Sequence, residues 1–123
     1  MKYIKTYTES IVDKCKEFRK ESLELLSFLL DDKSISFYLS YKHNSDLVHV
    51  SIQSARHNIR WSKYKEDIIQ YLEYMKNKHS IVLVNFSSLS YKGYTEKNSY
   101  VISYLEELDD FDFFEIDFDI RLK

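Results

Sequence analysis

The sequence predicts a single α+β domain that spans residues 1–123. Apolar residues recur at helical spacing near the N-terminus and again in the middle of the chain, whereas other segments alternate apolar and polar residues as strands do. A chain of 123 residues can also bury a core of its own without metal or disulfide bonds. We therefore expect a mixed or antiparallel sheet of about four to five strands, packed by about two to three helices.

The first expected elements are a short strand over residues 2–5 and a long helix. Thr6 and Glu9 have capping-box spacing, so the helix is predicted to begin near residue 7 or 8 and to run to about Asp31. Cys15, the only cysteine, lies in the apolar stripe and is expected to be a small buried residue. The stripe steps by four and three residues and consists of Ile11, Cys15, Phe18, Ser22, Leu25 and Leu29.

Two strands and a second helix follow. Residues 34–42 and 47–54 alternate, and turn-forming residues lie between them, which predicts a hairpin. After a connection over residues 55–61, Ser62 is predicted to cap a helix that ends near residue 78. The stripe of this helix that should face the core is Tyr64, Ile68, Tyr71, Leu72 and Met75.

The next segment is less regular. Residues 81–84 are an uninterrupted apolar run, which predicts a central strand covered on both faces. Residues 87–94 read as a polar loop, and residues 95–108 fit either a helix or a strand, with the helix favoured. The resulting order is β-α-β-β-α-β-α-β, or the same order without the first strand. With the first strand, it starts with the βαββαβ order of a ferredoxin-like sandwich and adds a C-terminal helix–strand extension.

The C-terminal strand has the clearest pattern in the chain. Its apolar face is Phe114, Ile116, Phe118, Ile120 and Leu122, and charged residues occupy the positions between them. From Glu106 to Asp119 there are eight acidic residues and no Lys or Arg. The alternation predicts a strand that covers the core with one face and presents acidic side chains on the other.

Several classes of function are excluded by composition. The chain has one Gly and no Pro, so it contains neither a P-loop nor a dinucleotide-binding fingerprint. The four histidines are scattered and none pairs at metal-ligand spacing. We expect no catalytic residue, no cofactor and no metal. Because no signal-peptide core and no membrane-length apolar run occur, we also expect a cytoplasmic protein without membrane contact.

The acid-rich segment is either a solvated outer face of the sheet or a surface that binds a cationic partner, and the second interpretation suggests a function in binding. In composition the chain resembles the small, acidic, single-domain immunity proteins of bacterial toxin systems, although no motif identifies a family. We expect a non-catalytic inhibitor that occupies a basic cleft of a toxin or nuclease, with a phage- or virus-encoded inhibitor of a host defence nuclease as an alternative. The expected contact residues are Glu106, Glu107, Asp109, Asp110, Asp112, Glu115, Asp117, Asp119, Tyr91, Tyr94, Tyr100 and Tyr104.

Two further alternatives use a basic, aromatic segment. It could grip phosphates and stack on bases, either as a small nucleic-acid-binding module or, together with the C-terminal acids, as a metal-dependent nuclease. A solvated loop with Trp61 anchored in the core explains the same residues, and a net charge of −2 argues against nucleic acid. Monomer and homodimer both stay open. The residues of the segment are Arg56, His57, Arg60, Trp61, Lys63 and Lys65.

Overall fold

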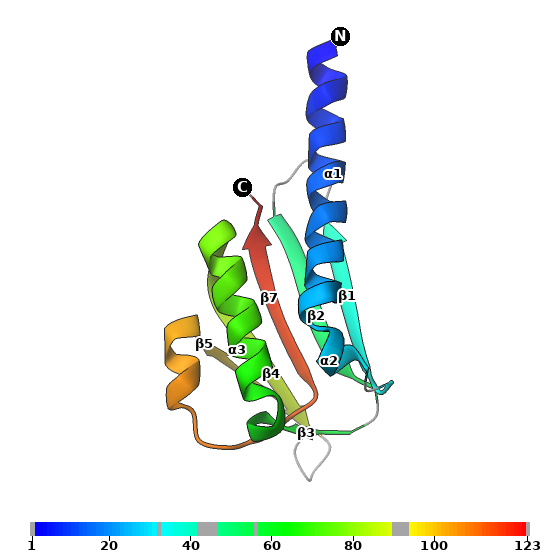
Figure 1. Cartoon of the computed structure of the whole chain (residues 1–123). Coiled ribbons are helices and arrows are strands. Elements are labelled where there is room, and N and C mark those ends of the chain that lie inside the picture. The colour runs from blue at the N-terminus through cyan, green and yellow to red at the C-terminus, as the bar shows by residue number, and fades with distance from the viewer. Residues whose placement is uncertain (1, 32, 42–46, 56, 90–93, 123) are drawn as a thin grey trace.

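The computed structural model describes residues 2–31, 33–41, 47–55, 57–89 and 94–122, with side chains described from residue 12 onward. The described chain folds into helices on one side of an antiparallel sheet (Figure 1). The helices are α1 (Lys2–Leu25), α2 (Ser27–Leu30), α3 (Trp61–Lys78) and the 3-10 helix η1 (Ile102–Glu107). The strands are β1 (Ile35–Tyr41), β2 (Leu47–Ser54), β3 (Ile59–Arg60), β4 (Ser80–Leu89), β5 (Thr95–Tyr100), β6 (Asp112–Phe113) and β7 (Glu115–Arg121).

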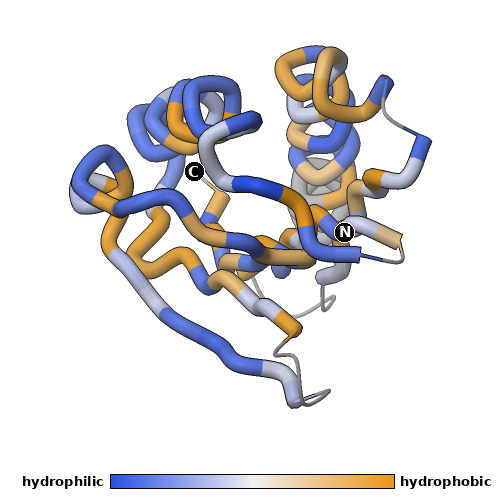
Figure 2. Tube along the Cα trace, turned by 90° about the horizontal axis from the view of Figure 1, so that it is seen from below, coloured by the Kyte–Doolittle hydropathy of each residue, from blue (hydrophilic) through white to orange (hydrophobic). Residues whose placement is uncertain are grey.

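The main sheet has five strands in the order β1-β2-β7-β4-β5, and every neighbouring pair is antiparallel. A second, two-stranded sheet joins β3 to β6. The long helices α1 and α3 lie on the same face of the main sheet, and the strands form the layer below them in Figure 2. The predicted α+β class is confirmed, as is the hairpin of β1 and β2.

The C-terminal strand β7 is the centre of this sheet. Ile116, Phe118 and Ile120 are fully buried against the helices, as their alternation predicts, because burying apolar surface is the main favourable term in folding. Phe114 precedes the strand and is only half-buried. The strand with the strongest sequence pattern therefore holds the middle of the core.

The predicted stripe of α3 packs against the core, whereas that of α1 does so only in part. Leu25, which was predicted to face the core, is 42% exposed, and Leu26 at the break after α1 is buried instead. The side chain of Ile11 lies outside the described part of the chain. In α1, Cys15 and Phe18 are buried, and burial raises the pKa of the Cys15 thiol. The five predicted stripe residues of α3 are buried as well. In Figure 1 the N-terminal part of α1 extends well beyond the ends of the strands.

The expected strand over residues 2–5 is wrong, because α1 already begins at Lys2. Without that strand the βαββαβ order of a ferredoxin-like sandwich does not occur in the described chain. Long helices can begin without a capping box when neighbouring residues have adequate propensity, so the Thr6 and Glu9 spacing did not mark the start. The predicted end near Asp31 holds, with a break at Leu26 that separates α1 from α2.

The prediction that residues 81–84 are covered on both faces is also wrong. The register between β4 and β7 shifts between Ile81 and Val84, and this bulge turns two apolar side chains toward solvent. Val82 is 75% exposed and Leu83 is 46% exposed. The strand then continues to Leu89, so residues 87–89 belong to β4 and not to the predicted loop, of which residues 90–93 lie outside the described chain.

Residues 95–108 contain both of the structures that their pattern suggested, so the preferred single helix is wrong. Thr95–Tyr100 is the edge strand β5, and a 3-10 helix follows it. Ile102 and Leu105, three residues apart, are buried by this short helix, which matches the three-residue repeat of 3-10 geometry. The helical spacing comes from η1 alone, and the prediction wrongly extended it over β5.

Candidate functional site

One face of the main sheet, which we call the open face, lies opposite α1 and α3. The acidic positions of β7 point to this face, since the apolar positions between them point to the helices. Pairing registers place one polar row across all five strands. The row consists of Tyr38, Ser51, Asp117, Asn85 and Ser99.

Asp117 lies at the middle of this row and is held by its neighbours. Asn85 Nδ2 donates a hydrogen bond of 3.0 Å to Asp117 Oδ1, and Lys97 Nζ lies 3.5 Å from Asp117 Oδ2. The Asp117 side chain is only 5% exposed. A carboxylate this buried costs free energy unless it is paired, so Asp117 holds β4 and β5 to β7 and is poorly placed to contact a partner.

The other two acids of β7 also have partners within the sheet. Glu115 Oε2 accepts hydrogen bonds of 2.7 Å from both Ser51 and Gln53 on β2. Asp119 Oδ1 lies 2.9 Å from His49 Nδ1, and both side chains are about half exposed. These partners were not predicted from the sequence, although the polar positions of residues 47–53 alternate with apolar ones as on any two-faced strand.

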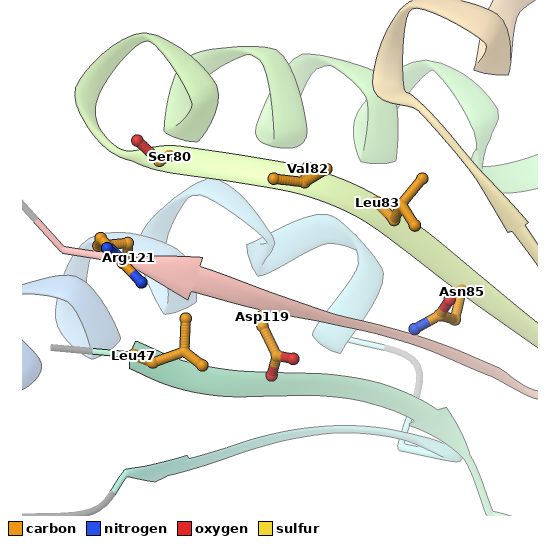
Figure 3. Close-up of a pocket in the computed structure, with 7 residues that line it drawn as sticks. All are labelled: Leu47, Ser80, Val82, Leu83, Asn85, Asp119 and Arg121. Atoms are coloured by element: carbon orange, nitrogen blue, oxygen red, sulfur yellow. The ribbon is translucent and has the colours of Figure 1, made fainter. Parts of the chain in front are cut away.

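A shallow pocket of about 510 Å³ lies on the open face beside this network (Figure 3). The bulge of β4 contributes Val82 and Leu83, β2 contributes Leu47, and β7 contributes Asp119 and Arg121. Its floor mixes exposed apolar side chains with both signs of charge. Such a surface suits contact with another molecule without selecting for a basic one.

All the remaining predicted acids except Glu106 lie elsewhere, along a second depression of about 420 Å³. It is bounded by β5 and the end of β4 on one side and by the chain from η1 to β6 on the other. We call it the acidic groove. Its lining includes five carboxylates, two tyrosines and no Lys or Arg. The five acids are Glu96, Glu107, Asp109, Asp110 and Asp112.

Two of these acids also bind the start of α3. Asp110 Oδ1 accepts a hydrogen bond of 2.9 Å from the Ser62 backbone N–H, and Oδ2 accepts one of 3.0 Å from the Ser62 hydroxyl. Arg60 lies 3.4 Å from both Asp110 and Asp112. The hydrogen bonds from Ser62, followed by the charge of Arg60, hold the pKa of Asp110 below its usual value. Asp110 therefore caps α3, a role predicted for Ser62 itself.

The tyrosines differ in their position. Tyr100 and Tyr104 stack with ring centroids 6.0 Å apart in the acidic groove, where Tyr104 is half-exposed. Tyr94 is 69% exposed at the start of β5, and Tyr91 lies outside the described residues. Glu106 does not line the groove and pairs with Lys65 at 3.6 Å. The predicted contact residues therefore do not form one surface, because part of them lie on the open face, part line the acidic groove, and Glu106 and Tyr94 do not line that groove.

The basic, aromatic segment does not form an exposed stacking surface. Trp61 is fully buried against Phe86, Phe111 and Phe113, so its ring cannot stack on bases and the interpretation as a core anchor is confirmed.

Most of the charges in this segment have intramolecular neighbours. Arg60 and Lys65 pair with acids, and Lys63 lies 5.3 Å from the Tyr64 ring centroid. His57 is exposed, and Arg56 lies outside the described residues.

In the part of the chain that the structure describes, no three His, Cys, Asp or Glu side chains lie close enough together to hold a metal ion. None of the described helices is both long enough and apolar enough to cross a membrane.

The chain matches no protein-family model, no curated protein and no solved structure. Geometry and charge are therefore the basis for any functional proposal.

Proposed function

We propose that this chain is a non-catalytic binding protein that neutralises a basic protein, a toxin or a nuclease, through the acidic groove. The observation that supports this is the lining of the groove, which gathers five carboxylates and no basic side chain. The acids of β7 have hydrogen-bonding partners inside the sheet and are a weaker choice. The proposal therefore moves the contact surface from the strand to the groove beside it.

Three acids of the groove supply its uncompensated charge. Glu96, Glu107 and Asp109 have no ion pair within the described chain, whereas Asp110 and Asp112 share Arg60. Charges of one sign around a concave surface reinforce one another and attract an oppositely charged partner over a distance of about 10 Å at 0.1 M ionic strength. Fast association of this kind suits an inhibitor that must act before its target does.

The tyrosine pair gives the groove a second way to hold a cation. An Arg or Lys side chain over an aromatic ring gains about 0.5–1 kcal/mol at an exposed site. Tyr100 and Tyr104 stack beside the carboxylates, so one guanidinium could meet a ring face and a carboxylate together. This arrangement favours Arg over Lys, because the flat guanidinium both stacks and pairs bidentately.

The test compares two variants with the same change of charge. The groove variant is Glu96→Gln, Glu107→Gln and Asp109→Asn, and the control neutralises three exposed acids of α3, Glu66→Gln, Asp67→Asn and Glu73→Gln. Parent and variants are immobilised, exposed to lysate of the native host, eluted stepwise with salt and analysed by mass spectrometry. We expect the parent and the control to retain a basic protein that salt releases, and the groove variant to retain at least tenfold less.

Equal retention by the groove variant and the control would show that the groove is not the contact surface. A separate assay addresses catalysis, in which the parent is incubated with DNA or RNA and magnesium or manganese. Cleavage that persists through purification would overturn the non-catalytic proposal. Both experiments apply equally to a bacterial toxin and to a host defence nuclease, because either partner would be a basic protein.

A further inference from the structure

We propose that the chain forms a two-fold symmetric dimer by pairing β1 with the β1 of a second copy, so that two five-stranded sheets join into one. The proposal concerns the edge of the sheet farthest from the acidic groove, and it does not depend on the function proposed for that groove. It rests on the exposure of this edge, the direction of its backbone groups and the symmetry of its sequence.

Within the described residues of β1, the outer edge carries no charge, no proline and no bulge. β1 pairs with β2 alone within the described chain, over seven residues and without a register shift. Edge strands normally carry charges, prolines or bulges that prevent another strand from adding to them. The opposite edge, β5, carries Glu96 and Lys97, whereas Ile35–Tyr41 contains no charged residue and no proline.

The backbone N–H and C=O groups of β1 that do not bond to β2 point outward, where a further strand could pair with them. The Ala55 N–H donates a hydrogen bond to the Ser34 carbonyl, and these two residues are directly opposite in the register of β1 and β2. In an antiparallel ladder such pairs alternate, so the even-numbered residues of β1 bond to β2. The N–H and C=O groups of Phe37 and Leu39 therefore point to the outer edge, where a new strand would meet them.

The strand is also chemically palindromic. Around Tyr38, Phe37 mirrors Leu39, Ser36 mirrors Ser40, and Ile35 mirrors Tyr41. A two-fold axis at Tyr38 brings each of these pairs together, apolar with apolar on the helix face and serine with serine on the open face. An interface between identical copies must be self-complementary in this way, and an unrelated partner strand would not need to be.

The short helix that packs against β1 carries an exposed apolar side chain. Phe28 is 80% exposed in α2, and α2 packs against β1. A second copy joined at β1 brings its own α2 to this side of the combined sheet. Exposed apolar side chains are often covered in an assembly, and pairing at β1 places the two helices that carry Phe28 on the same face of the combined sheet.

The test uses the residue at the proposed axis. Tyr38 is 54% exposed on the open face, so a charged residue there should leave the single chain folded. Two copies of Tyr38→Lys, or two of Tyr38→Glu, would place like charges opposite each other, whereas a mixture would place Lys opposite Glu. The control is Val82→Lys, which adds the same charge on the open face away from β1.

Light scattering coupled to size exclusion, over a range of concentrations, gives the mass of each sample. We expect the parent and Val82→Lys to reach twice the mass of one chain, each Tyr38 variant alone to stay at that of one chain, and the mixed variants to form the dimer again. A parent that stays monomeric at submillimolar concentration would overturn the proposal. A Tyr38→Lys dimer as strong as the parent's would also do so, and circular dichroism confirms that each variant is folded.

Discussion

At the scale of single residues, a hydrogen bond between two buried hydroxyl groups joins α1 to α3. Ser22 Oγ and Tyr71 OH lie 2.8 Å apart, and neither residue is more than 2% exposed. Burial raises the pKa of Tyr71, so the phenol stays neutral and forms a hydrogen bond with the neutral Ser22 hydroxyl. This contact holds the C-terminal half of α1 against the domain.

We expect Tyr71→Phe to lower the free energy of unfolding by about 1–3 kcal/mol, because it leaves the Ser22 hydroxyl buried without its partner. Adding Ser22→Ala removes the unpaired group, so the double variant should lose less than the sum of the two single losses. Urea denaturation of all four proteins measures this coupling. Strict additivity would mean that the two hydroxyl groups do not stabilise each other.

A second prediction at this scale concerns Asp110, whose pKa is lowered by its hydrogen bonds to Ser62. A carboxyl with a lowered pKa in the folded state stabilises the fold above its unfolded pKa of about 4 and loses that contribution as pH falls through the folded value. Asp110→Ala should therefore lower the melting temperature at neutral pH. The difference from the parent should shrink steadily below about pH 4.

The control for this variant is Asp109→Ala, which removes a neighbouring exposed acid that makes no hydrogen bond or ion pair within the described residues. Its melting curve should follow that of the parent at every pH. If the effect of Asp110→Ala were the same at neutral and acidic pH, the carboxylate would not be the group that caps α3.

At the scale of elements, the segments whose patterns come from burial were predictable. Ile116, Phe118 and Ile120 alternate because one face of β7 covers the core, and the stripe of α3 follows from the same cause. β4 was misread because its apolar run crosses a bulge, and no periodicity in the sequence marks where a register shifts. β5 was misread because an edge strand with two solvated faces has no apolar alternation to detect.

For the candidate site, the residues could be predicted from the sequence but their arrangement in space could not. The acids between Glu106 and Asp119 were found from the sequence, but their division between the open face and the acidic groove depends on contacts between distant segments. Asp117 is paired by Asn85 and Lys97, from two other strands, and neither residue is marked in the sequence as its partner. Strand order decides which polar residues become neighbours, and the sequence gives no direct signal of that order.

At the scale of the whole molecule, the acidic groove and the uncharged edge strand lie at opposite edges of the main sheet. Residues 1–78 carry a net charge of +3 and residues 79–123 carry −5, which sum to the −2 of the chain. The acidic groove lies along β5, and the uncharged edge lies at β1, with three strands between them. A dimer joined at β1 would hold its two acidic grooves at its outer ends, so partner binding and dimer formation need not compete.

Hydrogen exchange read at single amides tests this arrangement as a whole. β7 is paired on both sides at the centre of the sheet, so its amides should exchange only through global unfolding, while the amides of β5 that point outward should exchange much faster. In the parent at high concentration, the outward amides of Phe37 and Leu39 should be protected as well. In Tyr38→Lys they should lose that protection while β7 keeps its own, since the variant separates the copies and leaves each fold intact. Protection at β1 that is equal in the two proteins would place the dimer contact elsewhere, and protection in β5 equal to that in β7 would contradict the strand order itself.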